Sequence, residues 1–242
     1  MFRSFLGLAL VLTASITWAQ ETAEESKTWT HESEMALVTT TGNSENESTS
    51  AKQKTSYTHE SNIFTGTARY LRSKSGATET ARNWDAGLRY ERTLSEQWGV
   101  FVAHLVESDP YSGYIQRDSS DLGAKYSIVK TEEKKWLIEA GARYSDTYTI
   151  TGEHDRAGFG RLYSEYAQDL NESVSIKFWA EYLPNFKNRR AYLANSEASI
   201  TTLLTQVFSL KVAYLAKYQN EPASEQAKRT DTVFTTSLVA KF

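Results

Sequence analysis

Charged side chains at every second position are the residues of this chain that could do chemistry. Asp85, Arg89 and Glu91 follow this spacing. Because alternate side chains of a strand share a face, such groups can pair across neighbouring strands. We predict that twelve of them form a charge network on the inward face: Arg69, Asp85, Arg89, Asp121, Lys125, Glu139, Arg143, Arg161, Glu165, Lys177, Glu181 and Lys211.

The positive and negative charges on the predicted inward face nearly balance. Over all the predicted strands this face has nine basic and eight acidic residues. A row of one sign would favour selective passage of anions or of cations, and this balance favours neither. Two interpretations stay open. The charges fill a narrow lumen as ion pairs, or they line a narrow channel.

The four histidines give little support for catalysis. Only Glu153-His154-Asp155-Arg156 combines groups that could act as general acid and base, and this composition is also typical of a hydrated loop. No serine motif is matched to a histidine, and no spacing of His, Asp and Glu in the sequence resembles a metal site. We therefore expect no enzyme activity, no catalytic residue, no cofactor and no bound metal.

His104 does not fit its surroundings. It shares the phase of the apolar residues Trp98, Val100 and Val102. A β-bulge that shifts the register is the interpretation that would return it to a polar face.

Alternation of apolar and polar residues predicts strands throughout the chain. From Val174 to Tyr182 the even positions are apolar and the odd ones include Ser, Lys and Glu. Twelve strands are predicted, at residues 29–41, 45–58, 62–72, 81–93, 97–107, 115–129, 135–147, 156–168, 173–183, 190–203, 206–219 and 229–242. The segment 45–58 is polar on both faces, which leaves a count of ten open.

Short turns repeat along the chain with one pattern. Leu94, Leu170 and Leu204 each precede a polar turn and a large apolar residue four positions later. Each repeat is therefore one hairpin. Longer polar loops are predicted between these turns, at Gly42-Asn43-Ser44 and at residues 73–80, 108–116, 147–157, 184–190 and 219–229. Short turns at one rim and long loops at the other are typical of outer-membrane barrels.

The position of the aromatic residues separates a membrane barrel from a soluble one. Trp98, Trp136 and Phe208 follow short turns, and Tyr residues lie near the other strand ends, as in two interfacial belts. We thus predict an all-β fold, a single closed antiparallel transmembrane β-barrel of about 12 strands. Phe242, Ala240 and Leu238 share one face of the last strand and resemble the signal that barrel-assembly machinery reads.

Composition limits the function classes. The 242 residues contain no Cys and carry a formal charge of −3, which excludes a disulfide scaffold and argues against nucleic-acid binding.

An apolar run that follows Arg3 predicts a cleaved signal peptide at residues 1–19, so that residues 20–242 form the barrel domain. Asp109, Asp118, Asp146 and Asp155 lie in predicted loops, where they could contact lipopolysaccharide through divalent cations.

Several short segments together resemble a family of salt-induced outer-membrane proteins that is known as a domain of unknown function. These are Trp29 with Gly42-Asn43-Ser44, Glu107-Ser108-Asp109-Pro110-Tyr111 with Tyr114 and Arg117, Leu122-Gly123-Ala124-Lys125-Tyr126, Glu139-Ala140-Gly141-Ala142-Arg143-Tyr144, and Thr230-Asp231-Thr232 through Leu238 to Phe242. The resemblance covers almost the whole chain after the signal peptide. It implies an outer-membrane β-barrel and no established activity.

The sequence as a whole predicts a protein of the Gram-negative outer membrane, with a role in envelope structure or in narrow, porin-like passage of small solutes. Its expected partners are outer-membrane lipid, lipopolysaccharide and, during biogenesis, the barrel-assembly machinery. Two alternatives remain: an outer-membrane enzyme that acts through its extracellular loops, and a soluble periplasmic β-barrel binding protein.

Overall fold

The computed structural model describes residues 29–40, 45–221 and 228–242. The predicted signal peptide and the predicted loop Gly42-Asn43-Ser44 lie outside the described residues. No helix in the described part is both long and apolar enough to cross a membrane.

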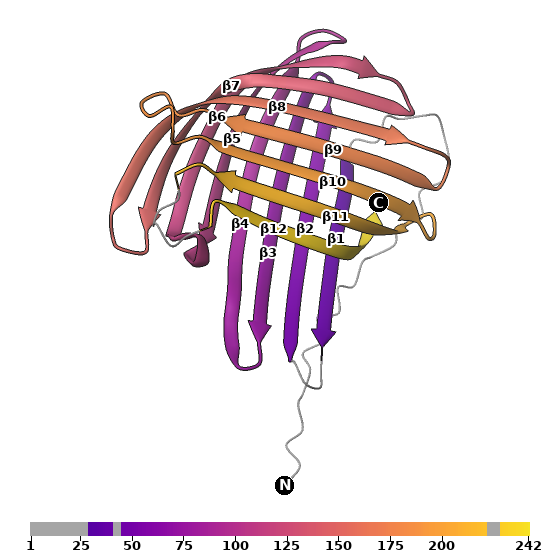
Figure 1. The fold of residues 1–242 in the computed structure, drawn as a ribbon. Coiled ribbons are helices and arrows are strands. Elements are labelled where there is room, and N and C mark those ends of the chain that lie inside the picture. The colour runs from indigo at the N-terminus through magenta and orange to yellow at the C-terminus, as the bar shows by residue number, and fades with distance from the viewer. Residues whose placement is uncertain (1–28, 41–44, 222–227) are drawn as a thin grey trace.

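Twelve antiparallel strands close into one barrel (Figure 1), which confirms the predicted fold class and strand count. Consecutive strands are neighbours, and the last strand returns to the first. The strands are β1 (Trp29–Thr40), β2 (Asn46–His59), β3 (Asn62–Ser75), β4 (Thr78–Thr93), β5 (Trp98–Asp109), β6 (Tyr114–Lys130), β7 (Lys134–Thr149), β8 (His154–Asp169), β9 (Val174–Leu183), β10 (Leu193–Leu203), β11 (Phe208–Gln219) and β12 (Thr230–Lys241); a 3₁₀ helix, η1 (Pro110–Ser112), joins β5 to β6.

The short turns share one hydrogen-bond geometry. The backbone N–H of Leu94 donates to the carbonyl of Trp98 at 2.8 Å, and Leu170 and Leu204 donate in the same way to Val174 and Phe208 at 2.8 and 2.9 Å. The repeated spacing in the sequence is therefore the spacing of this turn.

Two predicted long loops are shorter in the structure. The predicted loop at residues 73–80 is a tight turn in which Gly76 has a φ of 57°, because β3 and β4 pair up to Ser75 and Thr78. The predicted loop at 147–157 is likewise mostly strand, since β7 ends at Thr149 and β8 begins at His154. In both hairpins the regular alternation of apolar and polar residues ends before the backbone pairing does.

The closing seam between β1 and β12 is short. These strands pair only from Glu32 with Lys241 to Met35 with Leu238, whereas β1 and β2 pair from Trp29 to Thr40. In Figure 1, β1–β4 run steeply down the view while β9–β12 run across it. The strands therefore diverge beyond Met35, towards the long-loop rim.

Paired cysteines can test this short seam, because the chain has no native Cys. A Met35→Cys/Leu238→Cys variant is expected to form a disulfide, since cross-strand Cα atoms at about 4.5–5.5 Å lie within the range that a disulfide spans. The control, Leu37→Cys/Thr236→Cys, lies two positions further along, where the strands no longer pair, and is expected to stay reduced. Mobility on non-reducing gels after mild oxidation measures both, and equal cross-linking would show a continuous seam.

Candidate functional site

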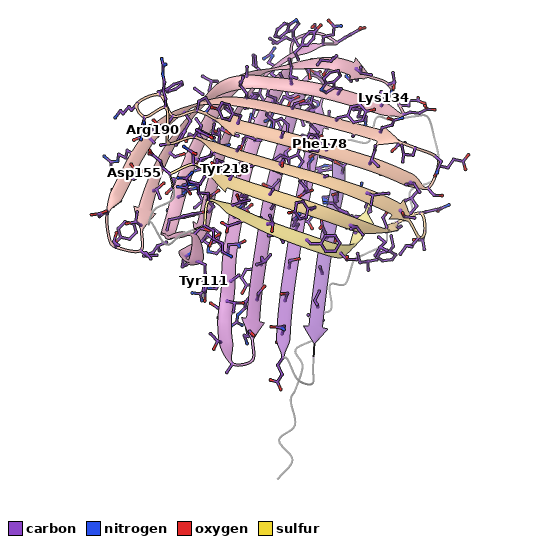
Figure 2. All side chains as sticks on the ribbon, viewed as in Figure 1. Tyr111, Lys134, Asp155, Phe178, Arg190 and Tyr218 are labelled. Atoms are coloured by element: carbon purple, nitrogen blue, oxygen red, sulfur yellow. The ribbon has the colours of Figure 1, made fainter. Side chains whose placement is uncertain are left out.

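The barrel has an apolar outer face and a charged interior. Leu88 and Leu122 are 74% and 64% exposed, while Glu139 and Arg161 are 6% and 7% exposed. Phe178 of β9 also stands on the outer surface (Figure 2). This is the reverse of the arrangement in a soluble barrel, which packs its apolar side chains inside.

Charged side chains meet across the lumen at mid-height. The carboxylate of Glu139 on β7 accepts hydrogen bonds from Arg89 of β4 and Arg161 of β8, both at 2.6 Å. Along the wall, β4 and β7 are three strand spacings apart, or about 14 Å. Arg89 and Glu139 therefore reach each other over the lumen and narrow it.

Further ion pairs extend this group along the barrel wall. Arg161 binds Glu181 of β9 at 2.8 Å, and Arg143 binds Asp121 of β6 at 2.7 Å. Arg143 also contacts Glu181 at 3.2 Å, so the pairs form one connected cluster. We call this group, Arg89, Asp121, Glu139, Arg143, Arg161 and Glu181, the central cluster.

The ring of Phe101 packs against two arginines of the central cluster, Arg89 and Arg161. The Arg89 and Arg161 guanidinium carbons lie 3.9 and 5.4 Å from its ring centroid, within cation–π range. Gly123 makes room for the ring, because a Cβ there would lie 2.8 Å from Phe101 Cζ. A Cβ at Gly141, its cross-strand partner, would clash with the Leu122 carbonyl.

A second cluster of charged side chains lies on the inner face of the barrel, next to the β1–β12 seam. Glu34 of β1 binds Lys211 at 3.1 Å and accepts a hydrogen bond from Ser237 at 2.7 Å. Lys52 of β2 lies 3.7 Å from Glu34 and 3.9 Å from Glu197 of β10. Because β2 and β10 are four strands apart in the barrel, this contact also crosses the interior.

The remaining predicted network residues form smaller pairs. Arg69 binds Asp85 at 2.5 Å, and Lys177 binds Glu165 at 2.8 Å. Lys125 binds Glu91, next to the central cluster. Each of the twelve predicted residues thus has an ion-pair partner in the structure, and their functional role stays a prediction.

Sequence reasoning missed Glu34, Lys52 and Phe101. The outer face of β2 is itself largely polar, and its Gln53 accepts a hydrogen bond from Ser33 of β1 at 2.5 Å, so alternation does not separate an inner from an outer face there. Phe101 is an apolar residue on the charged face, and its contacts with two arginines come only from the closure of the barrel.

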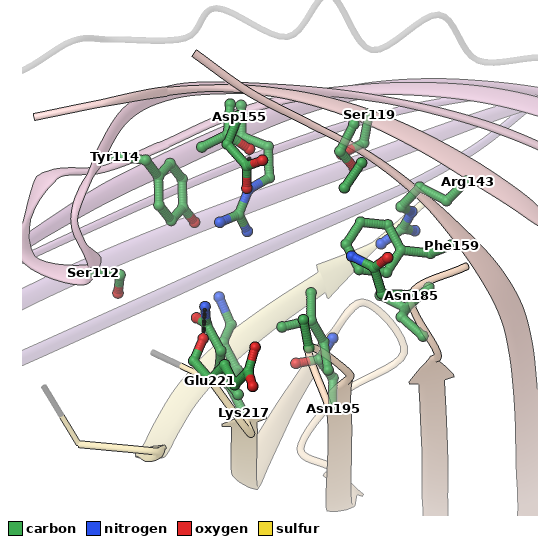
Figure 3. Close-up of a pocket in the computed structure, with 18 of the residues that line it drawn as sticks. Ser112, Tyr114, Ser119, Arg143, Asp155, Phe159, Asn185, Asn195, Lys217 and Glu221 are labelled. Atoms are coloured by element: carbon green, nitrogen blue, oxygen red, sulfur yellow. Dashed lines mark hydrogen bonds between the residues drawn. The ribbon is translucent and has the colours of Figure 1, made fainter. Parts of the chain in front are cut away.

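A vestibule opens at the long-loop rim above the central cluster. This cavity has a volume of about 710 Å³ and lies among η1, the ends of β6–β8 and the segments around Asn185 and Lys217. In Figure 3, Lys217 and Asn195 stand on one wall, and Tyr114 and Ser119 stand opposite. Arg143 lines the vestibule and belongs to the central cluster, which connects the two.

The segment around His154 does not assemble as a catalytic group. His154 lies on the outer face of its hairpin, 3.2 Å from Asp146, whereas Asp155 lines the vestibule. Among the described residues, no three His, Cys, Asp or Glu side chains are grouped to hold a metal ion. Asp146 and Asp155 therefore lie on opposite faces of the barrel wall.

The strand has no β-bulge at His104, so the interpretation of a register shift there is wrong. β5 pairs continuously with both neighbours there, His104 opposite Leu88 and Ser120. The side chain stays on the outer face, with Nδ1 3.0 Å from the Ser120 hydroxyl and Nε2 3.9 Å from Asp118. The outer face of the β5–β6 hairpin becomes polar at this height, which explains a histidine in the apolar phase.

The predicted assembly signal lies at the end of the seam. Leu238 and Phe242 are exposed, and the backbone of Phe242 exchanges hydrogen bonds with His31 at 2.7 and 3.1 Å. Ala240 pairs with Phe208 of β11 and with Ser33 of β1. Recognition of these residues during assembly stays a prediction.

One curated protein is similar to part of this chain. The uncharacterized protein YdiY of Escherichia coli strain K12 is 24% identical over 168 residues, which cover 69% of this chain and 64% of that protein. The chain therefore spans less than two thirds of that relative.

Two solved structures resemble this chain at low sequence identity. The NanC porin has a TM-score of 0.50 and 11% identity, covering 88% of this chain and 97% of that one. The translocator domain of the autotransporter NalP from Neisseria meningitidis has a TM-score of 0.45 and 10% identity, covering 88% and 87%. The likeness to the porin confirms the fold of an outer-membrane barrel and concerns the fold alone.

The expected membership in a domain family of unknown function is confirmed, while salt induction stays a prediction. The model of one family matches residues 33–242, which is all but the first β1 residues of the barrel. The chain belongs to the family described as protein of unknown function, DUF481.

Proposed function

We propose that this protein is a barrel of the Gram-negative outer membrane whose lumen is a narrow passage for small solutes, constricted by the central cluster. Its apolar outer face suits hydrocarbon, and closure of the barrel pairs the backbone of each strand with that of its neighbours, as a membrane-spanning sheet requires. Export by residues 1–19 and assembly through Phe242, Ala240 and Leu238 belong to this proposal, as do contacts with lipopolysaccharide.

The contact between Arg89 and Glu139 across the lumen carries the proposal. A barrel that is only a rigid envelope element could fill its interior with apolar side chains at native density. Here the side chains that narrow the lumen are charged, and they lie below a polar vestibule. Ion pairs can separate and rehydrate, so a polar solute could pass where an apolar plug would exclude it.

A purely structural role is the second candidate. The pairing of Lys52 with Glu197 and of Arg89 with Glu139 joins distant strands, which would also stiffen the barrel wall. The two functions differ in whether opening the network creates ion flow.

Planar-bilayer conductance distinguishes the two candidates. We expect small single-channel steps from the wild type and several-fold larger steps from Arg89→Ala/Glu139→Ala, because this variant removes one whole pair and leaves Arg161 with Asp121 and Glu181. The matched control is Arg72→Ala/Glu79→Ala, which removes a 2.8 Å pair from the hairpin of β3 and β4 and is expected to conduct as the wild type does.

Folding must be verified for each variant by the change in gel migration on heating. An absence of steps from folded Arg89→Ala/Glu139→Ala would refute passage and support the structural role.

A further inference from the structure

The vestibule differs in charge from the rest of the protein. The whole chain has a formal charge of −3. The lining of the vestibule has more cations than carboxylates, namely Arg117, Arg143, Arg156, Lys187, Lys217, Lys228 and Arg229 against Glu107, Asp155, Glu221 and Asp231. A concave surface with an excess of one sign concentrates ions of the opposite sign.

Existing ion pairs account for only part of this positive charge. Arg117 binds Glu107 at 3.2 Å, and Arg156 binds Asp146 at 2.9 Å. Arg143 is directed to Asp121 in the central cluster at 2.7 Å. These three arginines are therefore committed to protein carboxylates.

Lys217 differs from these arginines. It lies on β11 between Asn195 of β10 and Asp231 of β12, its cross-strand partners. Asp231 is exposed, and Lys217 forms no ion pair with it or with any other residue in the described ranges. The side chain is half-buried and lines the vestibule, so its ammonium group is available to an anion there (Figure 3).

Neutral polar and aromatic side chains complete the lining. Asn185, Asn195 and Ser112 can donate or accept hydrogen bonds, and Tyr114 and Tyr218 add aromatic rings. A volume of about 710 Å³ is in the range of small-molecule sites. This lining suits a ligand that has many hydroxyl groups and one negative charge.

We propose that the vestibule binds small, hydroxyl-rich carboxylates of the sugar-acid class, with Lys217 as the contact for the carboxylate. The inference rests on the proposed passage, since the vestibule would be its outer mouth. The proposed site adds a class of solute, sugar acids, to the proposed passage. The near balance of charge over the whole inward face did not favour anions or cations.

Calorimetric titration of the folded barrel in detergent tests this site. Glucuronate is expected to bind, and glucose at least about tenfold more weakly, because it lacks the carboxylate. Lys217→Gln is expected to lose at least about tenfold in glucuronate affinity, and Lys217→Arg to keep most of it. The matched control, Lys135→Gln, changes an exposed lysine at the opposite rim and is expected to bind as the wild type does.

Each outcome decides between the two proposals. Equal affinity for glucuronate and glucose in the wild type would overturn the anion site, even if Lys217→Gln failed to fold. Unchanged binding by folded Lys217→Gln would remove the role of Lys217. Glucuronate binding without conductance would refute passage and leave the site standing, whereas conductance without glucuronate binding would refute the site alone.

Discussion

Replacing Glu139 with alanine is expected to lower the free energy of unfolding by about 3–5 kcal/mol, because it removes one side of a buried ion-pair group. Glu139 is 6% exposed and binds two arginines. In the variant, Arg161 and Arg143 would keep Asp121 and Glu181 between them. Arg89 would share Glu91 with Lys125, so one half-buried positive charge would remain without compensation.

Urea unfolding of the barrel in lipid vesicles measures this loss. Glu132→Ala is the matched control, since Glu132 is exposed in the turn before β7, and its effect is expected to stay within about 0.5 kcal/mol. A change below about 1 kcal/mol for Glu139→Ala would mean that water already solvates the central cluster, contrary to the burial of Glu139.

The comparison of Glu139→Ala with Arg89→Ala/Glu139→Ala adds a further check. The double variant removes both partners, so it is expected to be more stable than the single one. This order would show that the cost comes from the unpaired Arg89 rather than from lost packing.

The fold could be predicted from the sequence because the outer face and the lumen take opposite kinds of side chain at alternate positions. Phe178 and Lys177 illustrate this rule, since one is exposed on the outer face and the other binds Glu165 inside. The pattern fails where both faces are polar. For this reason the sequence predicts a loop where β3 and β4 pair beyond Arg72, and a register shift at His104.

The site could be predicted only in part, because alternation identifies a face and not a partner. The twelve network residues were assigned to the inner face one strand at a time. Arg89 reaches Glu139 across the lumen while it stacks on Phe101, whose ring lies against Gly123, and these contacts arise only when the barrel closes. The vestibule was missed because its lining comes from segments that are far apart in the sequence, such as Tyr114 and Lys217.

A charged residue introduced on the apolar outer face is also expected to lower the free energy of unfolding strongly. Leu122 is 64% exposed near the middle of β6, with Val102 and Ala142 beside it on the neighbouring strands. Leu122→Arg would place a guanidinium group in the hydrocarbon, at a cost of about 2–4 kcal/mol at the bilayer midplane. Urea unfolding in lipid vesicles, with the wild type measured in parallel, gives this difference.

The sign of this effect separates a membrane barrel from a soluble one. In water, an arginine in place of an exposed leucine removes apolar surface and leaves the folded state unaffected or more soluble. Ile150→Arg is the matched control, since Ile150 is 57% exposed in the turn between β7 and β8, where the proposal places water. If Leu122→Arg destabilised the barrel no more than Ile150→Arg does, the apolar outer face could not be in contact with lipid.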